Sequence, residues 1–455
     1  MQTLTAPPVS LLREPARELK VLDHADVLVL GGGPGGVGAA LSAARAGARV
    51  VLVERFGTFG GTWTSGLLSS IMPYPHVRGL FHEIITRLDA RGGWRCAGRD
   101  DPYDWHTAKN EQPGTRPHGW GGTYDAEKLK VVLDEMIVEA GVVPYFFLVA
   151  AAVLRDGDRL LGVVVESKEG RHVITADVFI DATGDGDIAA LAGVATMSGR
   201  ESDGGLQPMT MMFKMDGVDD AAATAACVAD PSLAHAWQAA KARGEVSVPR
   251  ENVLLSPMPV PGQWVFNTTR VIGRDGTRVR DVSAAMIEGR RQVDEVATFL
   301  RRHIPGFADS RVSETAAHIG VRETRRVLCD YTITDEDLML PRRFPDAIAR
   351  GNWAIDIHNP GGEGTDFRHL TEGQYFEIPY RSIRARGVRN LLIASRCLDC
   401  THEAHAAIRI TPQIVAIGEA AGLAAALVSR DETPCVRALE IPRLRQGLRD
   451  RGALV

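Results

Sequence analysis

The pattern of hydrophobic and polar positions changes sharply at Asp26. Residues 1–20 mix proline, serine and charged residues without periodicity, which predicts an arm on the surface. From Asp26, DVLVL is a buried apolar run typical of a strand, GGGPGG predicts a turn, and the Ala-rich VGAALSAARAG predicts a helix ending at Gly47. The segment ARVVLVE predicts a second buried strand. Together these segments predict a βαβ unit with a short crossover, which starts a parallel sheet.

The later pattern predicts a mixture of strands and helices. A helix is expected over 126–140, and Gly141 follows it. Apolar runs around 146–154, 160–166 and 173–180, separated by Asp-Gly and Glu-Gly turns, predict a small antiparallel meander that returns to the main sheet. The middle of the chain mixes strands such as MTMMFKM with a helical stretch, 282–303. The buried pattern resumes with LLIAS and an apolar helix over about 411–429.

Composition limits the classes of protein to which this sequence can belong. A chain of 455 residues, 45% of them hydrophobic, favours two connected domains and allows an enclosed pocket. Its net charge of −5 comes from well-mixed residues, and its longest basic cluster, Arg322, Arg325 and Arg326, is short, so nucleic acid is not an expected partner. No secretory signal is evident, because Glu14 and Glu18 lie near the N-terminus and no uninterrupted apolar run precedes Val27. No membrane segment is evident either, because the apolar stretch 37–53 is interrupted by arginines. We expect a soluble cytoplasmic protein.

The six cysteines, at 96, 227, 329, 397, 400 and 435, are scattered, as is typical of thiols in a reducing compartment. Cys397 and Cys400 have the C-x-x-C spacing of redox dithiols and of half a zinc site. No second cysteine pair lies near enough to complete a tetrahedral site, so no metal is expected. Two packed thiols are the favoured interpretation, and a redox pair is the alternative.

A nucleotide-binding fingerprint lies between the first strand and helix. Gly31 permits the tight turn, Gly33 lets the backbone approach a pyrophosphate, and Gly36 allows the helix to pack on the sheet. Glu54 closes the second strand, where it can accept hydrogen bonds from ribose hydroxyls. The N-terminus of the helix then faces the phosphates with its partial positive charge. The alternative is a structural turn without a ligand.

NAD and FAD share this fingerprint, and three further segments favour FAD. FGGTWTSG lies just past the ribose-binding strand, VFIDATGDGD ends a strand near the nucleotide, and NLLIASRC provides a late strand and turn for the ribityl chain. The helix that begins near Thr411 would direct its positive end at the flavin ring. No second such unit is visible for a nicotinamide.

The chain resembles the FAD-dependent oxidoreductase family, related to the fumarate reductase and succinate dehydrogenase flavoprotein type of fold. The matching segments include GGGPGGVGAALSAARAGARVVLVER, DATGDGDIAALAG, GVRETRRVLCDYTITDEDL, AIDIHNPGG and NLLIASRCLDCTHEAHAAIRITPQIVAIGEAAGLAAAL. They run from Asp26 to about Leu427. Two departures are ASR in place of AGR at 394–396, and Cys400 three residues after Cys397.

This resemblance implies an α/β fold: a Rossmann-like FAD-binding domain of the glutathione reductase type 2, with an inserted α+β substrate domain. We expect the FAD-binding domain over 21–200 and 386–430, the substrate domain over 201–385, and a C-terminal extension over 431–455. The motifs and the resemblance together predict contacts with FAD from Gly31, Gly33, Pro34, Gly35, Gly36, Glu54, Arg55, Gly61, Thr62, Val149, Ala182, Thr183, Gly184, Asp185, Arg396 and Thr411.

Candidate catalytic residues follow from position. His402, Glu403, His405 and Arg409 lie between the flavin-binding turn and the ring-facing helix, so a histidine there is the expected proton acceptor. A structural hydrogen bond is an equally good interpretation of each histidine. Glu403 is a weaker candidate unless it is buried.

Substrate binding is expected from arginine. Arg322 could hold a substrate carboxylate through two parallel hydrogen bonds, with Arg409 as a second candidate. Arg325 and Arg326 more simply pair with Glu323 or other acids. His358, in the irregular stretch DIHNP, is the next candidate for proton transfer, and capping of a turn is its alternative role.

The expected function is FAD-dependent oxidation of a small organic substrate by hydride transfer. The closest alternative is a flavin monooxygenase or halogenase, although the GWxWxIP halogenase motif is absent. An alternative of another class is a regulatory flavin-binding protein without turnover. Residues 93–123 form a long Trp- and Gly-rich stretch, which predicts a lid over the pocket. The substrate, the final electron acceptor and the oligomeric state stay open.

Overall fold

The computed structural model describes residue 12, residues 14–96 and residues 121–455. Most of the predicted N-terminal arm and residues 97–120 of the predicted lid therefore lie outside the described residues.

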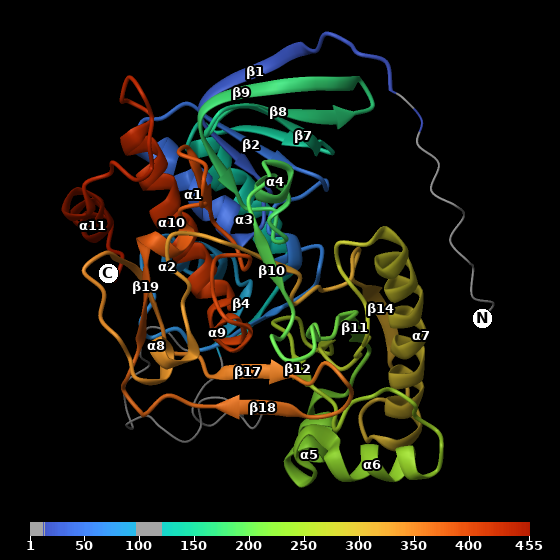
Figure 1. The fold of residues 1–455 in the computed structure, drawn as a ribbon. Helices are drawn as coiled ribbons and strands as arrows, with labels where there is room; N and C mark the ends of the chain where they lie inside the picture. Colours follow the sequence, from blue (N-terminus) through green and yellow to red (C-terminus); the bar gives the residue numbers. More distant parts are fainter. Residues whose placement is uncertain (1–11, 13, 97–120) are drawn as a thin grey trace.

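A mixed seven-stranded sheet forms the centre of the larger domain (Figure 1). Its strand order is β6-β2-β1-β9-β8-β7, and β20 also pairs with β9. Strands β6, β2, β1, β9 and β20 run parallel, whereas β7, β8 and β9 form an antiparallel meander. The predicted βαβ unit and the returning meander are confirmed. The strands are β1 Lys20–Leu30, β2 Val50–Glu54, β6 Val143–Phe146, β7 Val149–Asp156, β8 Arg159–Ser167, β9 Gly170–Asp181 and β20 Leu391–Ile393.

Strand β9 brings early and late segments of the chain together, because it pairs with different strands along its length. Its first half pairs with β8, while its last three residues, from Phe179 to Asp181, pair with β20. Strand β1 accompanies it on the other side. The carboxyl ends of β1, β9 and β20 therefore meet at one edge, although β20 comes from late in the sequence.

The helices beside this sheet also come from both ends of the chain. They are α1 Pro34–Arg45, α2 Leu80–Ala90, α3 Ala126–Glu139 and α10 Thr411–Val428. Helices α1 and α10 cross closely through small residues. A Cβ atom on Gly418 would lie 2.0 Å from the Gly35 carbonyl oxygen, and one on Gly422 would lie 2.1 Å from that of Ala39. Only glycine at these positions allows the two backbones to approach this far.

Helix α10 is long and apolar enough to cross a membrane by length and composition. In the structure, however, 89% of its apolar window is buried inside the protein. This burial accounts for its composition, because a helix surrounded by other elements of a core is apolar on all sides.

A smaller antiparallel sheet and three helices form a second hydrophobic core. The sheet has the order β12-β13-β11-β14, and the long helix α7 lies beside it (Figure 1). The elements are β11 Phe213–Asp216, α5 Asp220–Ala229, α6 Ala234–Ala242, β12 Leu255–Pro257, β13 Trp264–Phe266, α7 Val279–His303 and β14 Arg311–Thr315. The predicted helix 282–303 is present, while MTMMFKM forms a strand only in its last residues.

The extent of this second core differs from the predicted substrate domain, 201–385. Apart from Leu67, its buried residues run from Met209 to Ile319. Buried residues from Val327 to Ile383, and four more between Val436 and Val455, belong to the core of the larger domain. Residues 327–385 and the C-terminal extension therefore pack with the nucleotide-binding half.

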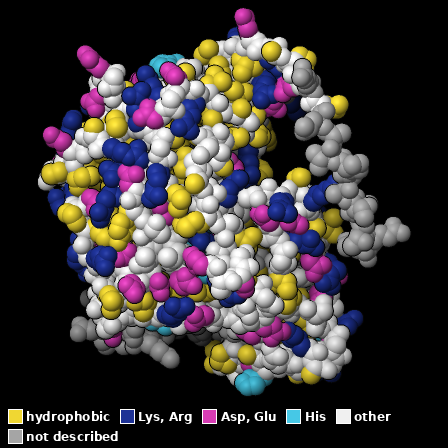
Figure 2. Space-filling view, in the orientation of Figure 1, with side chains coloured by type: hydrophobic (Ala, Val, Ile, Leu, Met, Phe, Trp, Pro, Cys, Tyr) yellow, Lys and Arg dark blue, Asp and Glu magenta, His cyan; other side chains and the backbone are white. Residues whose placement is uncertain are grey.

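The remaining elements are short and connect or cover the two cores. The strands are β3 Ser70–Ile71, β4 Trp94–Cys96, β5 Gly122–Tyr124, β10 Thr196–Ser198, β15 Arg325–Val327, β16 Ala347–Gly351, β17 Ile355–His358, β18 Thr365–Arg368 and β19 Phe376–Pro379. The helices are α4 Asp187–Leu191, α8 Asp335–Met339, α9 His402–Ile408 and α11 Ile441–Asp450, with 3-10 turns η1 Gly61–Trp63, η2 Pro231–Leu233 and η3 Tyr380–Ile383. Acidic and basic side chains are interspersed over the face shown in Figure 2.

Glu419, within α10, makes stability depend on pH. Its carboxylate is buried and accepts a hydrogen bond from the Leu80 amide at the start of α2 (3.0 Å). Burial raises its pKa to about 7, above the ordinary 4.5. The folded state therefore binds the proton more tightly than the unfolded state, and stability falls as pH rises from about 4.5 through about 7.

We expect Glu419→Gln to stabilise the protein above neutral pH. The amide can still accept the Leu80 hydrogen bond but does not ionise, so the gain is about 2–3 kcal/mol at high pH and close to zero in acid. Urea unfolding between about pH 5 and pH 8.5 would measure it. The exposed Glu432→Gln is the control. A gain that did not increase with pH would contradict the prediction.

Candidate functional site

A cavity of about 290 Å³ lies at the carboxyl edge of the parallel strands. Open α/β sheets bind ligands at this edge, just beyond the strand ends. The cavity wall includes the turn after β1, the end of β2, the turn after β9, the turn after β20 and the first residues of α10. The meander adds the segment 148–150, and the smaller domain adds residues on its opposite side.

The glycine-rich turn has the geometry that a close ligand requires. Gly31 adopts a φ of +99°, which disfavours any side chain, and a Cβ there would lie 2.4 Å from the Ala182 carbonyl oxygen. A Cβ on Gly36 would lie 1.8 Å from the Gly31 oxygen, so this glycine keeps α1 close to the turn. A Cβ on Gly33 would meet no atom within 4 Å. Since Gly33 lines the cavity, that open space fits a pyrophosphate.

Glu54 lies at the end of β2, in the cavity wall. One carboxylate oxygen accepts a hydrogen bond from the Gly32 amide (2.7 Å), and the other accepts one from the Phe56 amide (2.8 Å). Burial raises its pKa, and these two bonds act against that rise. Each oxygen keeps a further lone pair, so the fixed carboxylate can accept hydrogen bonds from ribose hydroxyls.

Two more turns complete the nucleotide half of the cavity. Arg396, after β20, donates a hydrogen bond of 2.6 Å to Asp185, after β9, and Thr324 donates another of 2.6 Å to the same oxygen. At the start of α10, the N-cap Ile410 offers no side-chain hydrogen bond. The first backbone amides of α10 can therefore serve a negatively charged ligand group at Thr411.

Fifteen of the sixteen residues expected to contact FAD line this cavity; the exception is Gly36, which lies behind the turn. They come from segments far apart in the sequence, from Gly31 to Thr411. The sequence motifs therefore identified one continuous surface.

The wall toward the smaller domain is rich in arginine. Arg322 donates hydrogen bonds to the Pro208 carbonyl and the Thr210 hydroxyl (both 2.7 Å) and a longer one to Asn267 (3.3 Å). These partners are all neutral. Burial lowers the pKa of Arg322, and the charge of Arg409 acts in the same direction. Both arginines line the cavity, as predicted for residues that orient a substrate.

Asp356 and His358 lie on the same face of β17, two residues apart, and both line the cavity. His358 Nδ1 lies 3.2 Å from an Arg270 guanidinium nitrogen, which can only donate. The imidazole proton therefore resides on Nε2, which lies 3.5 Å from Asp356 Oδ1. Burial lowers the pKa of His358 well below its ordinary value, with Arg322 the strongest charge acting on it, so the ring is neutral.

Asp356 was missed in the sequence, although the D-x-H spacing in DIHNP was a usable signal. Its Oδ1 has no hydrogen-bond partner among the described residues, and its Oδ2 lies 3.7 Å from Arg409. His358 was predicted in an irregular stretch, but it is the last residue of a strand. A free carboxylate oxygen in the wall of a cavity is a candidate proton acceptor.

The structure does not bring His402, Glu403 or His405 to the cavity wall. Two of them, His402 and His405, lie three residues apart on α9 and so share one face of this helix, which is fully buried. His402 Nδ1 lies 2.9 Å from Glu323. The pKa of His405 is lowered well below its usual range, first by burial and then by Arg409. The contact with Glu323 favours the structural interpretation of His402, whereas His405 is buried and its Nδ1 has no hydrogen-bond partner among the described residues.

The other candidate side chains also have structural partners. Arg326 pairs with Glu323, and Arg325 pairs with Asp187. Cys397 and Cys400 are buried free thiols whose pKa values are raised, mainly by burial. These thiols fit the packed interpretation, because a redox dithiol needs exposure and a lowered pKa.

A family model described as FAD dependent oxidoreductase matches residues 26–448. The chain belongs to this family. FAD is its cofactor, and its activity is that of an FAD-dependent oxidoreductase.

Solved structures are similar to this chain at low sequence identity. A geranylgeranyl bacteriochlorophyll reductase-like protein from Thermoplasma acidophilum is 14% identical, with a TM-score of 0.51, over 94% of this chain and 84% of that chain. The flavin-dependent brominase Bmp2 is 13% identical, with a TM-score of 0.47, over 94% and 83%. The p-nitrophenol 4-monooxygenase PnpA from Pseudomonas putida DLL-E4 is 15% identical, with a TM-score of 0.42, over 68% and 70%.

We expect Gly33→Leu to yield colourless protein. The side chain would project into the open space that fits the pyrophosphate, so it should exclude the cofactor while leaving the fold intact. The ratio of flavin absorbance to protein absorbance measures the loss, and circular dichroism checks the fold. A folded variant with its full complement of flavin would place the pyrophosphate elsewhere.

Proposed function

We propose that this protein dehydrogenates a small organic acid at the junction of the two domains. One observation supports this proposal above the others. The cavity wall beside the nucleotide half carries both a half-buried arginine with only neutral partners, Arg322, and an unpartnered carboxylate oxygen, Asp356 Oδ1. When bound, FAD supplies the oxidant, which accepts a hydride from a substrate carbon whose attached hydroxyl or amino group loses its proton.

Arg322 would bind the acid group of the substrate. Its guanidinium is held in place by the Pro208 carbonyl, Thr210 and Asn267, none of which neutralises its charge. A guanidinium can form two parallel hydrogen bonds to a carboxylate, and these fix both the position and the orientation of the ligand. Arg409 already faces Asp356 at 3.7 Å, so it holds that carboxylate in place.

Asp356 would accept the substrate proton through Oδ1. The arrangement around it supports this role, because Arg409 holds the other oxygen and His358 Nε2 lies 3.5 Å from Oδ1. The neutral imidazole carries its proton on Nε2, so it can donate a hydrogen bond but cannot readily take a proton. His358 is therefore a positioning residue that orients Asp356.

We also assign the main sheet to the Rossmann-like, glutathione reductase type 2 group of FAD-binding folds. Three features support this assignment: the βαβ unit with its Gly31 turn, the antiparallel meander of β7 to β9, and the return of β20 beside β9.

A screen for bleaching of the flavin without oxygen tests the proposed function. We would mix the protein anaerobically with 2-hydroxy acids and 2-amino acids, and with the neutral amide of each. The expected result is loss of the oxidised flavin absorbance with at least one acid and little loss with its amide. Bleaching by a reduced nicotinamide alone, followed by oxygen-dependent product formation, would instead support a monooxygenase.

We expect Arg322→Met to impair use of the acid identified in that screen. Loss of a charged hydrogen-bonding partner should lower kcat/KM by about 10- to 10²-fold, mainly through KM. Arg278→Met removes an exposed arginine outside the cavity and is the matched control. If both variants reacted alike, Arg322 would not bind the acid group.

A further inference from the structure

A second cavity, about 160 Å³, adjoins the first on the side of the smaller domain. The two share the wall residues Ser70, Met72, Met212, Asn267, Asp356 and His358. A ligand in the first cavity therefore has a path into the second, past the proposed proton acceptor. The further wall of the second cavity is built by the segment between α6 and β12 and by the β17–β18 hairpin.

Arg250 lies in that segment and lines the second cavity. The side chain is buried, with 2% of the residue exposed, and its Nε and one terminal nitrogen, Nη1, have no hydrogen-bond partner among the described residues. The backbone around it is fixed, because the Arg250 carbonyl accepts hydrogen bonds from Trp237 Nε1 (2.8 Å) and Lys241 Nζ (3.1 Å). Burial, followed by the charge of Arg270, lowers its pKa to about 10, so the group stays charged at neutral pH.

The neighbouring charges do not balance. Arg270 lies 3.5 Å from Glu251, and Arg409 lies 3.7 Å from Asp356. In the part of the chain that the structure describes, Arg250 and Arg322 have no carboxylate within 4.0 Å. Among the described residues, the group formed by Arg250, Arg270, Arg322 and Arg409 with the carboxylates of Glu251 and Asp356 has two positive charges in excess, and the neutral His358 lies beside them.

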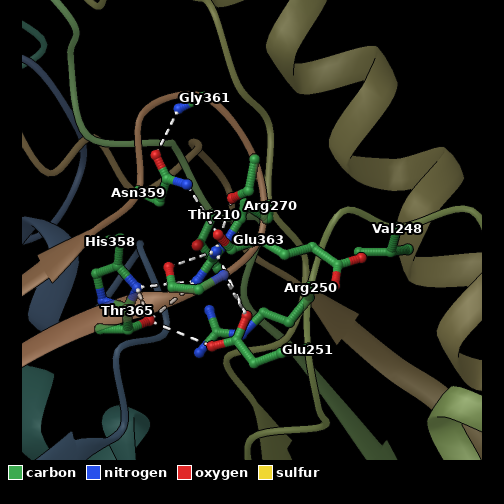
Figure 3. A network of polar contacts seen from close by, with 12 residues as sticks. Thr210, Val248, Arg250, Glu251, Arg270, His358, Asn359, Gly361, Glu363 and Thr365 are labelled. Carbon is green, nitrogen blue, oxygen red and sulfur yellow. Dashed lines mark hydrogen bonds and ion pairs between the residues drawn. The ribbon is translucent and has the colours of Figure 1, made fainter.

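Glu251 attracts Arg250, whose charge lowers the pKa of this carboxyl, but no ion pair within 4.0 Å joins the two among the described residues, and the carboxylate also makes structural contacts. Figure 3 shows its carboxylate beside Arg270 and Thr365. One oxygen accepts a hydrogen bond from the Gly364 amide (3.2 Å), and the other accepts one from the Thr365 hydroxyl (3.2 Å). These contacts tie the segment that carries Arg250 to the β17–β18 hairpin.

We propose that Arg250 forms a second anion-binding subsite, which takes a carboxylate or phosphate group at the far end of an elongated substrate. This inference rests on the proposed function, in which Arg322 binds the first acid group. The substrate is then an organic dianion, with Asp356 between its two binding groups. Buried unpaired charges are costly, and a dianion neutralises both arginines at once.

Binding of oxidised holoenzyme to unreactive anions tests the subsite without turnover. The probes are α,ω-dicarboxylates from malonate to suberate, ω-phosphonocarboxylates of matched length, and monocarboxylates of the same carbon number. Calorimetry and the shift in melting temperature report binding. One chain length should bind at least about 10-fold more tightly as a dianion than as the monocarboxylate, because it engages both arginines. The comparison of carboxylate with phosphonate identifies which end group Arg250 prefers.

Arg250→Met should lower the affinity for the best dianion by about 10- to 10²-fold. It should change the affinity for the monocarboxylate less than about 2-fold, because only the far contact is lost. Arg250→Lys keeps the charge but loses the paired hydrogen bonds, so it should lie in between. Arg278→Met, which removes an exposed arginine, should change neither affinity. Retained flavin content shows that each variant is folded.

Two results would overturn the subsite: no preference for dianions at any chain length in the parent protein, or a preference that survives Arg250→Met. These results are separable from failure of the proposed function. If dianions bind as expected but no hydroxy acid or amino acid reduces the flavin, the subsite stands and the dehydrogenation does not. If an acid reduces the flavin but its rate and affinity are unchanged in Arg250→Met, the dehydrogenation stands and the subsite does not.

Discussion

Asp356→Asn should bind FAD normally and have its flavin reduced about 10²- to 10⁴-fold more slowly than the parent, which is the usual cost of losing a general base. The asparagine keeps the shape of the side chain and its place on β17 but cannot take a proton. Single-turnover reduction under anaerobic conditions, with the acid identified by screening, measures the rate directly. Flavin content and melting temperature should match those of the parent.

The neighbouring strand offers a matched control for this variant. Asp366 lies on β18, is exposed, and does not line either cavity. The flavin of Asp366→Asn should therefore be reduced at the parental rate. His402→Ala and His405→Ala should lose stability or flavin content before they lose rate, since both side chains are buried away from the cavity. If the flavin of Asp356→Asn were reduced at the normal rate while that of His402→Ala was not, the proton acceptor would lie on α9.

Gly418→Val should destabilise the protein by at least about 3 kcal/mol and remove its flavin, because the new side chain has no room. Its Cβ would lie 2.0 Å from the backbone oxygen of Gly35, which belongs to the nucleotide-binding turn. Helix α10 would then have to move away from α1, and the turn that fits the pyrophosphate would move with it.

Urea unfolding and flavin content measure the two effects of this variant separately. Gly362→Ala is the control, because a Cβ there would meet no atom within 4 Å. Parental stability in Gly418→Val would show that the contact between the two helices adjusts easily.

The nucleotide half of the site could be predicted because its signals are local. Gly31, Gly33 and Glu54 lie within one βαβ unit, and the alternation of strand, turn and helix around them fixes their relative positions. The helix that became α10 was also visible from its length and composition. Local pattern did not show which core the strands of 327–385 join, since β16 pairs only with β19 and β17 only with β18, and their apolar residues would suit either core.

The substrate half depends on contacts between distant segments. Asp356, Arg250 and Arg322 come from three parts of the chain that only the folded molecule brings together. The sequence locates α9 correctly along the chain, but it does not show how this helix is rotated about its axis. His402 and His405 were therefore expected at the cavity, which they do not line. That rotation follows from packing, including the contact of His402 with Glu323.

The close crossing of α1 and α10 has a consequence for synthesis of the protein. The βαβ unit emerges from the ribosome long before the glycines that pack against it, Gly418 and Gly422. Contacts of such high sequence separation form slowly and leave apolar surface exposed in the meantime. A nascent chain should therefore need chaperone protection until α10 is released, and it should acquire FAD only after α10 has been translated.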